Sequence, residues 1–345
     1  MRDPGRRRMD GRERAQRAVD FDGPDRVPII HSILVGAFHK YGDELKRLVE
    51  EEYPADFLRA DYRKDWAKGR ALGPGESYTD EWGCLWTGLS NDYIGQVTEH
   101  PLNDWSATAD YSFPDPEEVG DWKAAAEAAA SGRGAVYAIG KGGEYFERMQ
   151  WLRGFENLMY DFAEGRKELK PLSEEIIKHN LKVVELWAAS GADLDALQFG
   201  DDWGSQMALM MRPQVWREFF KPNYKRMFDL AHEFGWRVHF HSDGNVSEIV
   251  GDLVEIGVDV LNIQLPVMDM NALSRELKGK VCIRGGLDRQ KILPRGTCDE
   301  VRAHVREVYA AFGSPGGGWI GNGEIGPDVP LENARAMYEE IVSLA

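Results

Sequence analysis

Short strands alternate with single helices through the second half of the chain, and this order restricts the fold more than any other feature. Strands are expected at 194–199 and 236–241, and apolar residues at helical spacing predict helices at 214–234 and 246–256. The same order continues with strands at 258–265, 280–287 and 318–321 and with helices at 271–277, 298–312 and 331–344. Strands joined by single helices predict a parallel sheet.

The first half of the chain is less regular. Residues 26–32 and 135–140 have the composition of strands, whereas 69–104 contains aromatic residues and glycines without a clear period. We expect that segment to be an insertion over one end of a single-domain α/β fold, a (β/α)8 TIM barrel spanning 1–345, with a flexible or helical N-terminal extension at 1–20. A barrel is preferred to an open sheet because polar clusters follow the strands repeatedly, which is where barrel enzymes build their sites.

The balance of charge argues against two classes of partner. With 42 basic and 58 acidic residues the formal net charge is -16, which repels nucleic acid and anionic lipid surfaces. No run approaches the ~18 apolar residues of a membrane helix, and three cysteines are too few for a disulfide framework, so we expect a cytoplasmic protein without a membrane partner. The arginines near the start of the chain are expected on a frayed, solvated terminus: Arg2, Arg6, Arg7, Arg8, Arg12, Arg14 and Arg17.

Two polar clusters that follow strands predict a metal site. His239 and His241 share one face of a strand, and Asp243 joins that face if the chain stays extended. Glu324 follows the last expected strand, which in a closed barrel brings it to the same rim. One imidazole and two carboxylates, from His241, Asp243 and Glu324, could hold a divalent cation with a position left open for substrate. The alternative is structural, because an Asp before a helix is commonly its cap and a Glu in a Gly-rich loop is commonly solvated.

Further polar residues are candidates for catalysis or substrate binding. Asp202 is favoured over Asp201 as a catalytic acid or base, although a helix cap is nearly as well supported. Asn262 and Gln264 alternate on a strand, which would place two amides in the barrel lumen. The remaining substrate-binding candidates are His31, Gln206, His239 and Asp288. Both of these histidines could equally be hydrogen-bonded core residues.

Charged and aromatic residues outside these clusters have simpler explanations. Glu144 and Arg148, four residues apart, are expected to form an ion pair on a helix. Most of the eleven tryptophans are expected to pack in the core or in a lid, with some left to line an aromatic pocket. The tryptophans considered for such a pocket include Trp82, Trp86, Trp151 and Trp203.

Five short motifs resemble, in their order along the chain, those of the uroporphyrinogen decarboxylase superfamily. They are Asp25-Arg26-Val27-Pro28, Gly200-Asp201-Asp202-Trp203-Gly204-Ser205-Gln206, His241-Ser242-Asp243-Gly244-Asn245, Gly285-Gly286-Leu287-Asp288 and Pro330-Leu331-Glu332-Asn333. The resemblance runs from about Gly11 to the C-terminus and implies a (β/α)8 barrel with one of two activities. One branch decarboxylates porphyrinogens, and the other comprises zinc-dependent methyltransferases that exchange methyl groups with a corrinoid protein.

The positions that match the zinc ligands of the thiol-methylating members carry different residues here. Those members use a His and two cysteines, whereas the matching positions are His241, Asp243 and Glu324. Carboxylates are harder than thiolates, so the metal, zinc or another divalent ion, should act as a Lewis acid toward oxygen. The resemblance therefore implies O-demethylation of a methoxylated small molecule, with an aromatic ether as one candidate. The methyl acceptor would be a corrinoid (cobalamin) cofactor on a separate protein, and a homodimer is one arrangement left open.

Two alternative functions remain. Porphyrinogen decarboxylases of this superfamily carry an arginine-rich segment after the first strand, where this chain has Ile29-Ile30-His31-Ser32-Ile33-Leu34. Without those guanidinium groups, and with an acidic chain, a substrate with many carboxylates would bind poorly. The other alternative is a non-catalytic binding barrel that has lost its chemistry together with the two cysteines. The metal-competent carboxylates at both of those positions argue against it.

Overall fold

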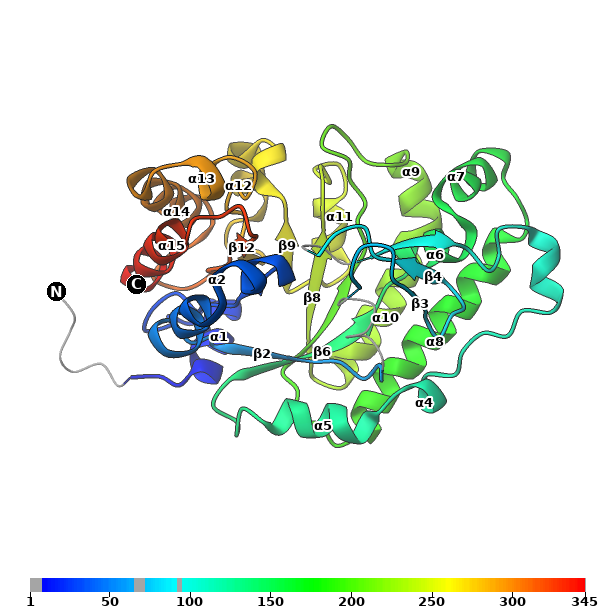
Figure 1. Cartoon of the computed structure of the whole chain (residues 1–345), viewed down its shortest axis with the longest axis horizontal. Helices are drawn as coiled ribbons and strands as arrows, with labels where there is room; N and C mark the ends of the chain where they lie inside the picture. The colour runs from blue at the N-terminus through cyan, green and yellow to red at the C-terminus, as the bar shows by residue number, and fades with distance from the viewer. Residues whose placement is uncertain (1–7, 65–71, 92–94, 345) are drawn as a thin grey trace.

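A curled sheet of seven parallel strands forms the centre of the molecule, and each strand pairs with the next in chain order (Figure 1). The computed structural model describes residues 8–64, 72–91 and 95–344. The strands are β2 (Phe57–Ala60), β6 (Tyr137–Gly143), β7 (Ala196–Gly200), β8 (Arg237–Ser242), β9 (Val260–Ile263), β10 (Cys282–Arg284) and β11 (Trp319–Ile320). The α/β class predicted from the strand–helix alternation is confirmed, and the first half of the chain contributes β2 and β6.

The two edges of this sheet are linked through the segment that the sequence assigns to the first strand. β1 (Ser32–Ile33) pairs in parallel with β12 (Glu324–Ile325), and Ile29 forms a parallel bridge with Gly321. On the other side, the amide of Asp56, next to β2, donates to the carbonyl of Ile29 (2.8 Å). Strand ends from both halves of the chain therefore meet at one rim.

Helices cover the outer face of the sheet (Figure 1). The longer ones are α2 (Val35–Arg47), α8 (Leu169–Ala189), α10 (Lys221–Glu233), α14 (Cys298–Phe312) and α15 (Leu331–Ser343). The shorter ones are α1 (Gly11–Val19), α4 (Pro116–Val119), α5 (Trp122–Ala130), α6 (Phe146–Arg153), α7 (Phe155–Glu164), α9 (Pro213–Val215), α11 (Val250–Glu255), α12 (Met270–Leu277) and α13 (Ile292–Arg295). Two π-helical turns, η1 (Leu48–Glu52) and η3 (Trp216–Phe220), and two 3-10 turns, η2 (Trp105–Ala109) and η4 (Leu265–Val267), complete the elements. In the described ranges, no helix is both long enough and apolar enough to cross a membrane.

The N-terminal extension is an integral part of the fold. Ala15 and Val19 of α1 pack against an apolar layer formed by the strands at the bottom of the lumen. The other members of that layer are Ile30, Phe57, Tyr137, Ile139, Ala196, Val260, Cys282 and Ile320. α1 therefore closes the end of the lumen opposite to the rim that carries the polar clusters.

The arginines of this extension are held by carboxylates. Arg14 is buried, and its Nη1 lies 2.6 Å from Asp56 Oδ1. Arg12 Nε lies 2.8 Å from Asp195 Oδ1. The expectation of a solvated basic terminus is therefore wrong for Arg12 and Arg14, because carboxylates of the strand ends pair with them. The predicted arginines at positions 2, 6 and 7 lie outside the described residues.

The segment expected to be an insertion contains a small antiparallel sheet of its own. Its strands are β3 (Ser77–Thr79), β4 (Leu85–Thr87) and β5 (Gln96–Glu99), while residues 69–71 and 92–94 lie outside the described ranges. The carboxylate of Asp80 organises the β3–β4 turn, since it accepts hydrogen bonds from the amides of Trp82 and Cys84. Strands of three or four residues are too short to show a period in the sequence.

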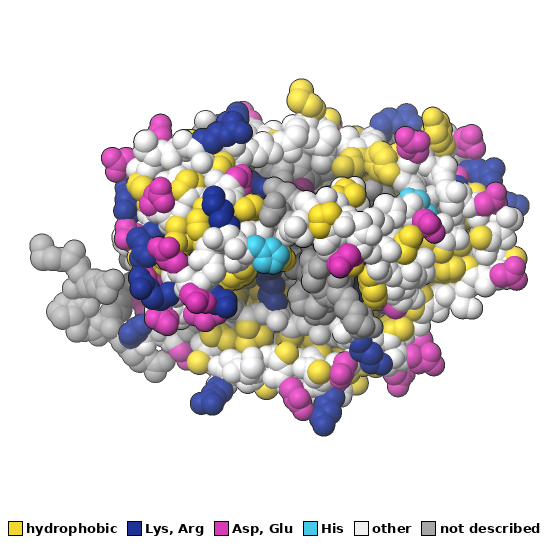
Figure 2. Space-filling view, in the orientation of Figure 1, with side chains coloured by type: hydrophobic (Ala, Val, Ile, Leu, Met, Phe, Trp, Pro, Cys, Tyr) yellow, Lys and Arg dark blue, Asp and Glu magenta, His cyan; other side chains and the backbone are white. Residues whose placement is uncertain are grey.

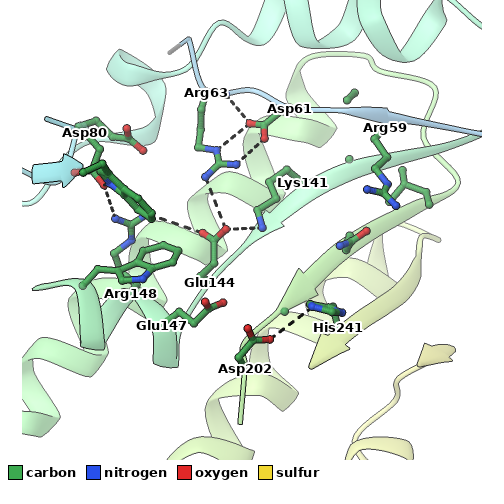
Figure 3. Close-up of a pocket in the computed structure, with 18 of the residues that line it drawn as sticks. Arg59, Asp61, Arg63, Asp80, Lys141, Glu144, Glu147, Arg148, Asp202 and His241 are labelled. Atoms are coloured by element: carbon green, nitrogen blue, oxygen red, sulfur yellow. Dashed lines mark hydrogen bonds and ion pairs between the residues drawn. The ribbon is translucent and has the colours of Figure 1, made fainter. Parts of the chain in front are cut away.

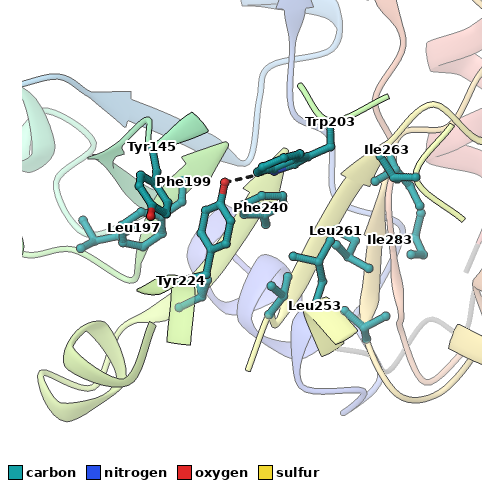
Figure 4. Packing of buried hydrophobic residues seen from close by; sticks show 14 of the residues in the cluster. Tyr145, Leu197, Phe199, Trp203, Tyr224, Phe240, Leu253, Leu261, Ile263 and Ile283 are labelled. Carbon is teal, nitrogen blue, oxygen red and sulfur yellow. Dashed lines mark hydrogen bonds between the residues drawn. The ribbon is translucent and has the colours of Figure 1, made fainter. Parts of the chain in front are cut away.

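Large aromatic side chains fill the space between the sheet and its helices (Figure 4). Trp203 is fully buried, stacks on Phe146 at a centroid distance of 3.9 Å, and donates from Nε1 to the hydroxyl of Tyr224 (3.0 Å). Trp203 is therefore a core residue, not a pocket residue. On the molecular surface, Lys and Arg side chains are interspersed with Asp and Glu, so the described part of the face in Figure 2 offers no continuous basic patch.

Candidate functional site

Two neighbouring strand ends bring three side chains with ligand atoms together. His241 lies in β8, Asp243 follows that strand directly, and Asp202 follows β7. His241 Nε2 is 3.6 Å from Asp202 Oδ1 and 3.8 Å from Asp243 Oδ1, and one ligand atom of each residue lies within 4.8 Å of the others. We call these three residues the carboxylate–histidine cluster (Figure 3 shows Asp202 and His241). Atoms that ligate one metal lie about 3–4 Å from one another, so this spacing is close to that of a metal site.

Two glycines allow the loops that carry these carboxylates to meet. Gly244 has a φ of +78°, and a Cβ on it would come within 2.0 Å of the carbonyl oxygen of Gly204. The amide of Gly204 donates to the carbonyl of Asp243 (3.1 Å), and the amide of Asp243 donates to Asp202 Oδ1 (2.9 Å). A larger residue at position 244 would separate the two loops and the carboxylates on them.

The imidazole of His241 is oriented by Asn262 on β9. The distance from His241 Nδ1 to Asn262 Oδ1 is 2.9 Å, and because an amide oxygen only accepts, Nδ1 carries the proton. Asn262 Nδ2 in turn donates to the carbonyl of Arg284 (2.9 Å), which fixes the direction of the amide. In the neutral imidazole, Nε2 of His241 would therefore present its lone pair to the two carboxylates, the arrangement of histidines that bind metals.

Glu324 lies on the same rim but outside this cluster. Its Oε1 is 2.5 Å from Nη1 of Arg289, and both side chains line a cavity of about 230 Å³ that His241 and Asp243 also line. The structure thus groups Asp202, and not Glu324, with His241 and Asp243, which differs from the predicted ligand set. The ligand set differs because Glu324 pairs with Arg289, which lies on the loop after β10 and is therefore distant from Glu324 in the sequence. A role for Glu324 as ligand or catalyst stays a prediction.

Burial and mutual repulsion raise the pKa values of two carboxyl groups at this rim, those of Asp243 and Glu324. Burial raises the pKa of Asp243, the positive charge that His241 can carry opposes the shift, and the charge of Asp202 adds to it. Burial also raises the pKa of Glu324, with Arg289 opposing the shift. Carboxyl groups that repel one another in this way favour the binding of a cation.

A larger cavity, of about 420 Å³, opens on the other side of His241 (Figure 3). Asp202 and His241 form part of its wall. The rest of the wall includes cationic and aromatic residues, namely Arg59, Arg63, Lys141, Arg148, Tyr78, Trp86 and Trp151, together with the acids Asp61, Asp80, Glu81, Glu144 and Glu147. Since Tyr78 and Trp86 come from the small antiparallel sheet, the inserted segment covers this cavity, as the sequence analysis expects.

Three of these cations are paired with acids in the wall. The pairs are Arg63 Nη2–Asp61 Oδ2 (2.7 Å), Lys141 Nζ–Glu144 Oε1 (2.5 Å) and Arg148 Nη1–Asp80 Oδ2 (3.1 Å). Glu144 and Arg148 do form an ion pair, at 3.9 Å, but Glu144 precedes α6, so the pair belongs to this larger network and does not lie on a helix. Burial alone would raise the pKa of Glu144, yet the surrounding cations lower it below the ordinary value, so this carboxylate stays ionised.

Glu147 is a further carboxylic acid in the wall of the larger cavity. Burial raises its pKa well above the ordinary value, and the negative charges of Asp202, Asp201 and Glu144 raise it further. A neutral carboxylic acid in a cavity wall can donate a proton. The sequence around Glu147 gives no sign of this shift, because the two acids that raise its pKa most, Asp202 and Asp201, follow β7 and lie far from it along the chain.

Asp201 and Asp202 take different roles. The sequence allows each of them to be either a helix cap or a residue that faces the cavity. Asp201 is buried and accepts hydrogen bonds from the amides of Tyr145 (3.0 Å) and Glu147 (2.7 Å) at the start of α6. It therefore caps a helix. Asp202 faces the cavity, in keeping with the preference given to it.

Four of the residues predicted to contact a substrate line the smaller cavity. Asn262, Gln264, Gln206 and Asp288 all line it. Gln206 Nε2 donates to Gln264 Oε1 (3.2 Å), while Asp288 also caps the following turn by accepting from two backbone amides. Their position is suitable for binding, and that role stays a prediction.

The two remaining histidine candidates line neither of these cavities. His31 Nδ1 lies 2.9 Å from the hydroxyl of Tyr338, and its Nε2 lies 3.1 Å from the carbonyl of Val49. His239 is buried in the lumen beside Tyr137, with the ring centroids 5.7 Å apart, and burial lowers its pKa well below the ordinary value. His31 is thus placed as a hydrogen-bonded core residue, the alternative that the sequence leaves open. His239 is a core residue too, but among the described residues neither of its ring nitrogens has a hydrogen-bond partner.

Comparison with known proteins extends these observations. A family model described as uroporphyrinogen decarboxylase (URO-D) matches residues 91–344. Among solved structures, a methyltransferase from Methanosarcina mazei is similar with a TM-score of 0.72 over 96% of this chain and 98% of that chain, at 17% sequence identity. A likeness at this identity concerns the fold alone. An intracellular xylanase from Thermoanaerobacterium saccharolyticum (TM-score 0.42, 11% identity, 87% of this chain and 86% of that one) is too distant to support an argument.

Proposed function

The chain belongs to the uroporphyrinogen decarboxylase (URO-D) family, and from that premise we propose that it is a metal-dependent methyltransferase acting on a methoxylated small molecule. The methyl group would pass to a corrinoid cofactor carried by a separate protein. The observation that carries this proposal is the carboxylate–histidine cluster, because oxygen ligands make a metal more suited to an ether oxygen than to a thiol. His241 lines both cavities, so a group bound at the cluster can be reached from either side.

We further infer the architecture that supports this site. The segment 28–33 joins β2 to β11 and β12, which supports a closed (β/α)8 barrel formed by a single domain. Such closure would place all strand ends on one rim, where barrel enzymes bind their substrates.

The donor set of the cluster fits a divalent cation, zinc or another. His241 offers the lone pair of Nε2, and Asp202 and Asp243 each offer an oxygen, so the two carboxylates would neutralise the charge of the ion. Glu324 remains a candidate for a further ligand, in competition with its pairing to Arg289. When bound, the ion would stabilise the negative charge that develops on the ether oxygen as its bond to the methyl group breaks.

The residues around the cluster supply the rest of the proposed chemistry. As the methyl–oxygen bond breaks, the methyl group leaves for its acceptor and the oxygen takes up a proton. Glu147 is suited to donate that proton, because its pKa is raised and it lines the same cavity as Asp202 and His241. The negative charge of Asp202 helps to keep this donor protonated. Trp86 and Trp151 pack edge to face, with their ring centroids 5.0 Å apart, and form an aromatic wall that suits an aromatic ether.

A carboxy-lyase is the second candidate, and the cations of the larger cavity favour it. Three of them are nevertheless paired with acids of the protein, and a cavity of about 420 Å³ suits a single-ring compound better than a tetrapyrrole. A non-catalytic binding barrel is the least favoured, since it gives no account of an acid with a raised pKa in the same cavity as two members of a candidate metal site.

Metal analysis and a transfer assay test the proposed function together. We expect the purified protein to bind about one equivalent of a divalent metal and to demethylate a methoxylated compound in the presence of cob(I)alamin. Asp243→Asn should reduce metal affinity and transfer by more than the ~10–100-fold typical of outer-shell substitutions. Glu248→Gln, an exposed change nearby, is the matched control and should leave both unchanged. A protein that binds no metal and transfers no methyl group to cob(I)alamin from any of a panel of methoxy compounds would contradict the proposal.

A further inference from the structure

Beneath the carboxylate–histidine cluster, the next layer of the lumen carries polar side chains. His239 precedes His241 by two residues on β8 and pairs in register with Gln198 on β7. Arg284 reaches this layer from β10, where its Nη1 donates to Gln198 Oε1 (3.1 Å). Arg59 reaches it from β2 and lines the larger cavity beside Gln198 (Figure 3 shows Arg59). We call Arg59, Gln198 and Arg284 the cavity floor.

Arg284 carries a buried charge that the described protein does not neutralise. Only 3% of the residue is exposed, and its acceptors are two neutral amides, Gln198 Oε1 at 3.1 Å and Asn322 Oδ1 at 3.4 Å. Burial lowers the pKa of its guanidinium, and the positive charge of Arg59 lowers it further. An arginine nevertheless keeps its proton in proteins, so a positive charge remains buried here without a counter-ion from the described residues.

The other buried arginines of the described chain show that this arrangement is exceptional. Three more arginines are buried, and each has a carboxylate within ion-pair distance. The pairs are Arg14–Asp56 (2.6 Å), Arg148–Asp80 (3.1 Å) and Arg153–Asp161 (2.8 Å). An uncompensated buried charge costs stability, so the fold tolerates at Arg284 a cost that it avoids at the other three positions. A ligand anion in the cavity would offset that cost.

We propose that the cavity floor binds a carboxylate of the substrate, with Arg59 and Gln198 at the cavity surface and Arg284 acting from behind Gln198. The substrate class is then a small methoxylated carboxylic acid, and an aromatic acid such as a methoxybenzoate matches the wall of Trp86 and Trp151. The assignment of the methoxy end to the carboxylate–histidine cluster rests on the proposed function, whereas the binding of the carboxylate does not. A ligand held at both ends would have its ether oxygen positioned for reaction.

Binding measurements by calorimetry test the carboxylate site without any methyl transfer. Benzoate and 4-methoxybenzoate should bind about 10–100-fold more tightly than the neutral 4-methoxybenzyl alcohol, as expected for charge-assisted hydrogen bonds. Arg59→Gln should remove this preference and leave the weak binding of the alcohol unchanged, whereas Arg59→Lys should retain part of it. Arg284→Gln should weaken benzoate binding in the same direction. Arg275→Gln, exposed on α12, is the control and should bind all three compounds like the wild type.

The outcomes separate this inference from the proposed function. Equal affinity for the acids and the alcohol, or a preference that survives Arg59→Gln, would overturn the carboxylate site even if methyl transfer is found. A preference that depends on Arg59 in a protein without transfer activity would keep the carboxylate site and contradict the proposed function. Because Arg284 is buried, substituting it could also destabilise the fold. The Arg284→Gln result therefore counts only if that variant has the unfolding temperature of the wild type. If it does not, the variants of the exposed Arg59 decide the test.

Discussion

At the scale of single residues, the contact between His241 and Asn262 decides which ring nitrogen is available to a metal. Asn262→Ala removes the acceptor that lies 2.9 Å from Nδ1, so the imidazole can rotate and change tautomer. Because outer-shell contacts of this kind fix ligand orientation, we expect affinity for Zn²⁺ to fall about 10–100-fold. Competition with a chromogenic chelator at pH 7 measures the change.

Two further variants control for this effect. Asn262→Asp keeps an oxygen acceptor for Nδ1, so it should retain affinity within a few-fold of wild type. Asn271→Ala changes an exposed amide on α12 and should have no effect. If Asn262→Ala bound Zn²⁺ as tightly as the wild type, the tautomer assigned to His241 would be wrong.

The proximity of site residues could be predicted from sequence where one strand determines it. His241 and Asp243 follow from the spacing along β8 alone. The choice between Asp202 and Glu324 as their neighbour depends instead on the contact between Gly204 and Gly244, and on the partner that Arg289 provides. These contacts join different strands, and no local pattern encodes them.

At the scale of elements, local signals predicted helices better than short strands. α14 has the predicted bounds because Thr297 and Glu300 form a capping box at its start. The predicted strand at 280–287 is reduced to β10, since Gly285 and Gly286 adopt positive φ angles. β2 was not predicted, because Arg59 in the lumen interrupts the apolar run that is typical of a buried parallel strand.

The packing of α8 against the inserted segment predicts a pH-dependent stability. His179 on α8 contacts Trp82 at a centroid distance of 4.5 Å, and its Nδ1 lies 3.0 Å from the carbonyl of Pro114. Burial lowers the pKa of His179 from 6.5 to about 4. Below pH 6.5 the unfolded chain therefore binds a proton that the folded protein does not, so stability falls as the pH drops toward 4. We expect a loss of about 2 kcal/mol between pH 7 and pH 5 from this residue, measured by urea unfolding.

Variants at two histidines isolate this contribution. His179→Gln keeps a donor for the carbonyl of Pro114 but cannot be protonated, so its stability should change less between pH 7 and pH 5 than that of the wild type. His39→Gln, exposed on α2, controls for the loss of a histidine. A His179→Gln protein with the same pH dependence as the wild type would show that burial of this imidazole is not what limits stability in acid.

At the scale of the whole molecule, Asp56 ties the N-terminal helix and the segment that follows it to one edge of the seven-stranded sheet. Its carboxylate accepts from Arg14 Nη1 of α1 (2.6 Å), from Arg26 Nη1 (2.8 Å) and from the amide of Ile29 (2.8 Å). The same residue precedes β2, the edge strand of the sheet. One buried carboxylate thus connects α1, residues 26–29 and the edge strand β2.

Removing that carboxylate should therefore loosen the attachment of α1 and of residues 26–29 to β2. Asp56→Asn can still accept from Ile29 but leaves Arg14 buried beside fewer negative charges, and we expect a loss of about 3–5 kcal/mol in the free energy of unfolding. Hydrogen exchange should report lost protection in α1 and β2 first, while the amides of α14, at a distance in the fold, keep theirs. Asp43→Asn, fully exposed on α2, is the matched control. A uniform loss of protection across the molecule, or none in α1, would mean that Asp56 does not tie α1 and residues 26–29 to β2.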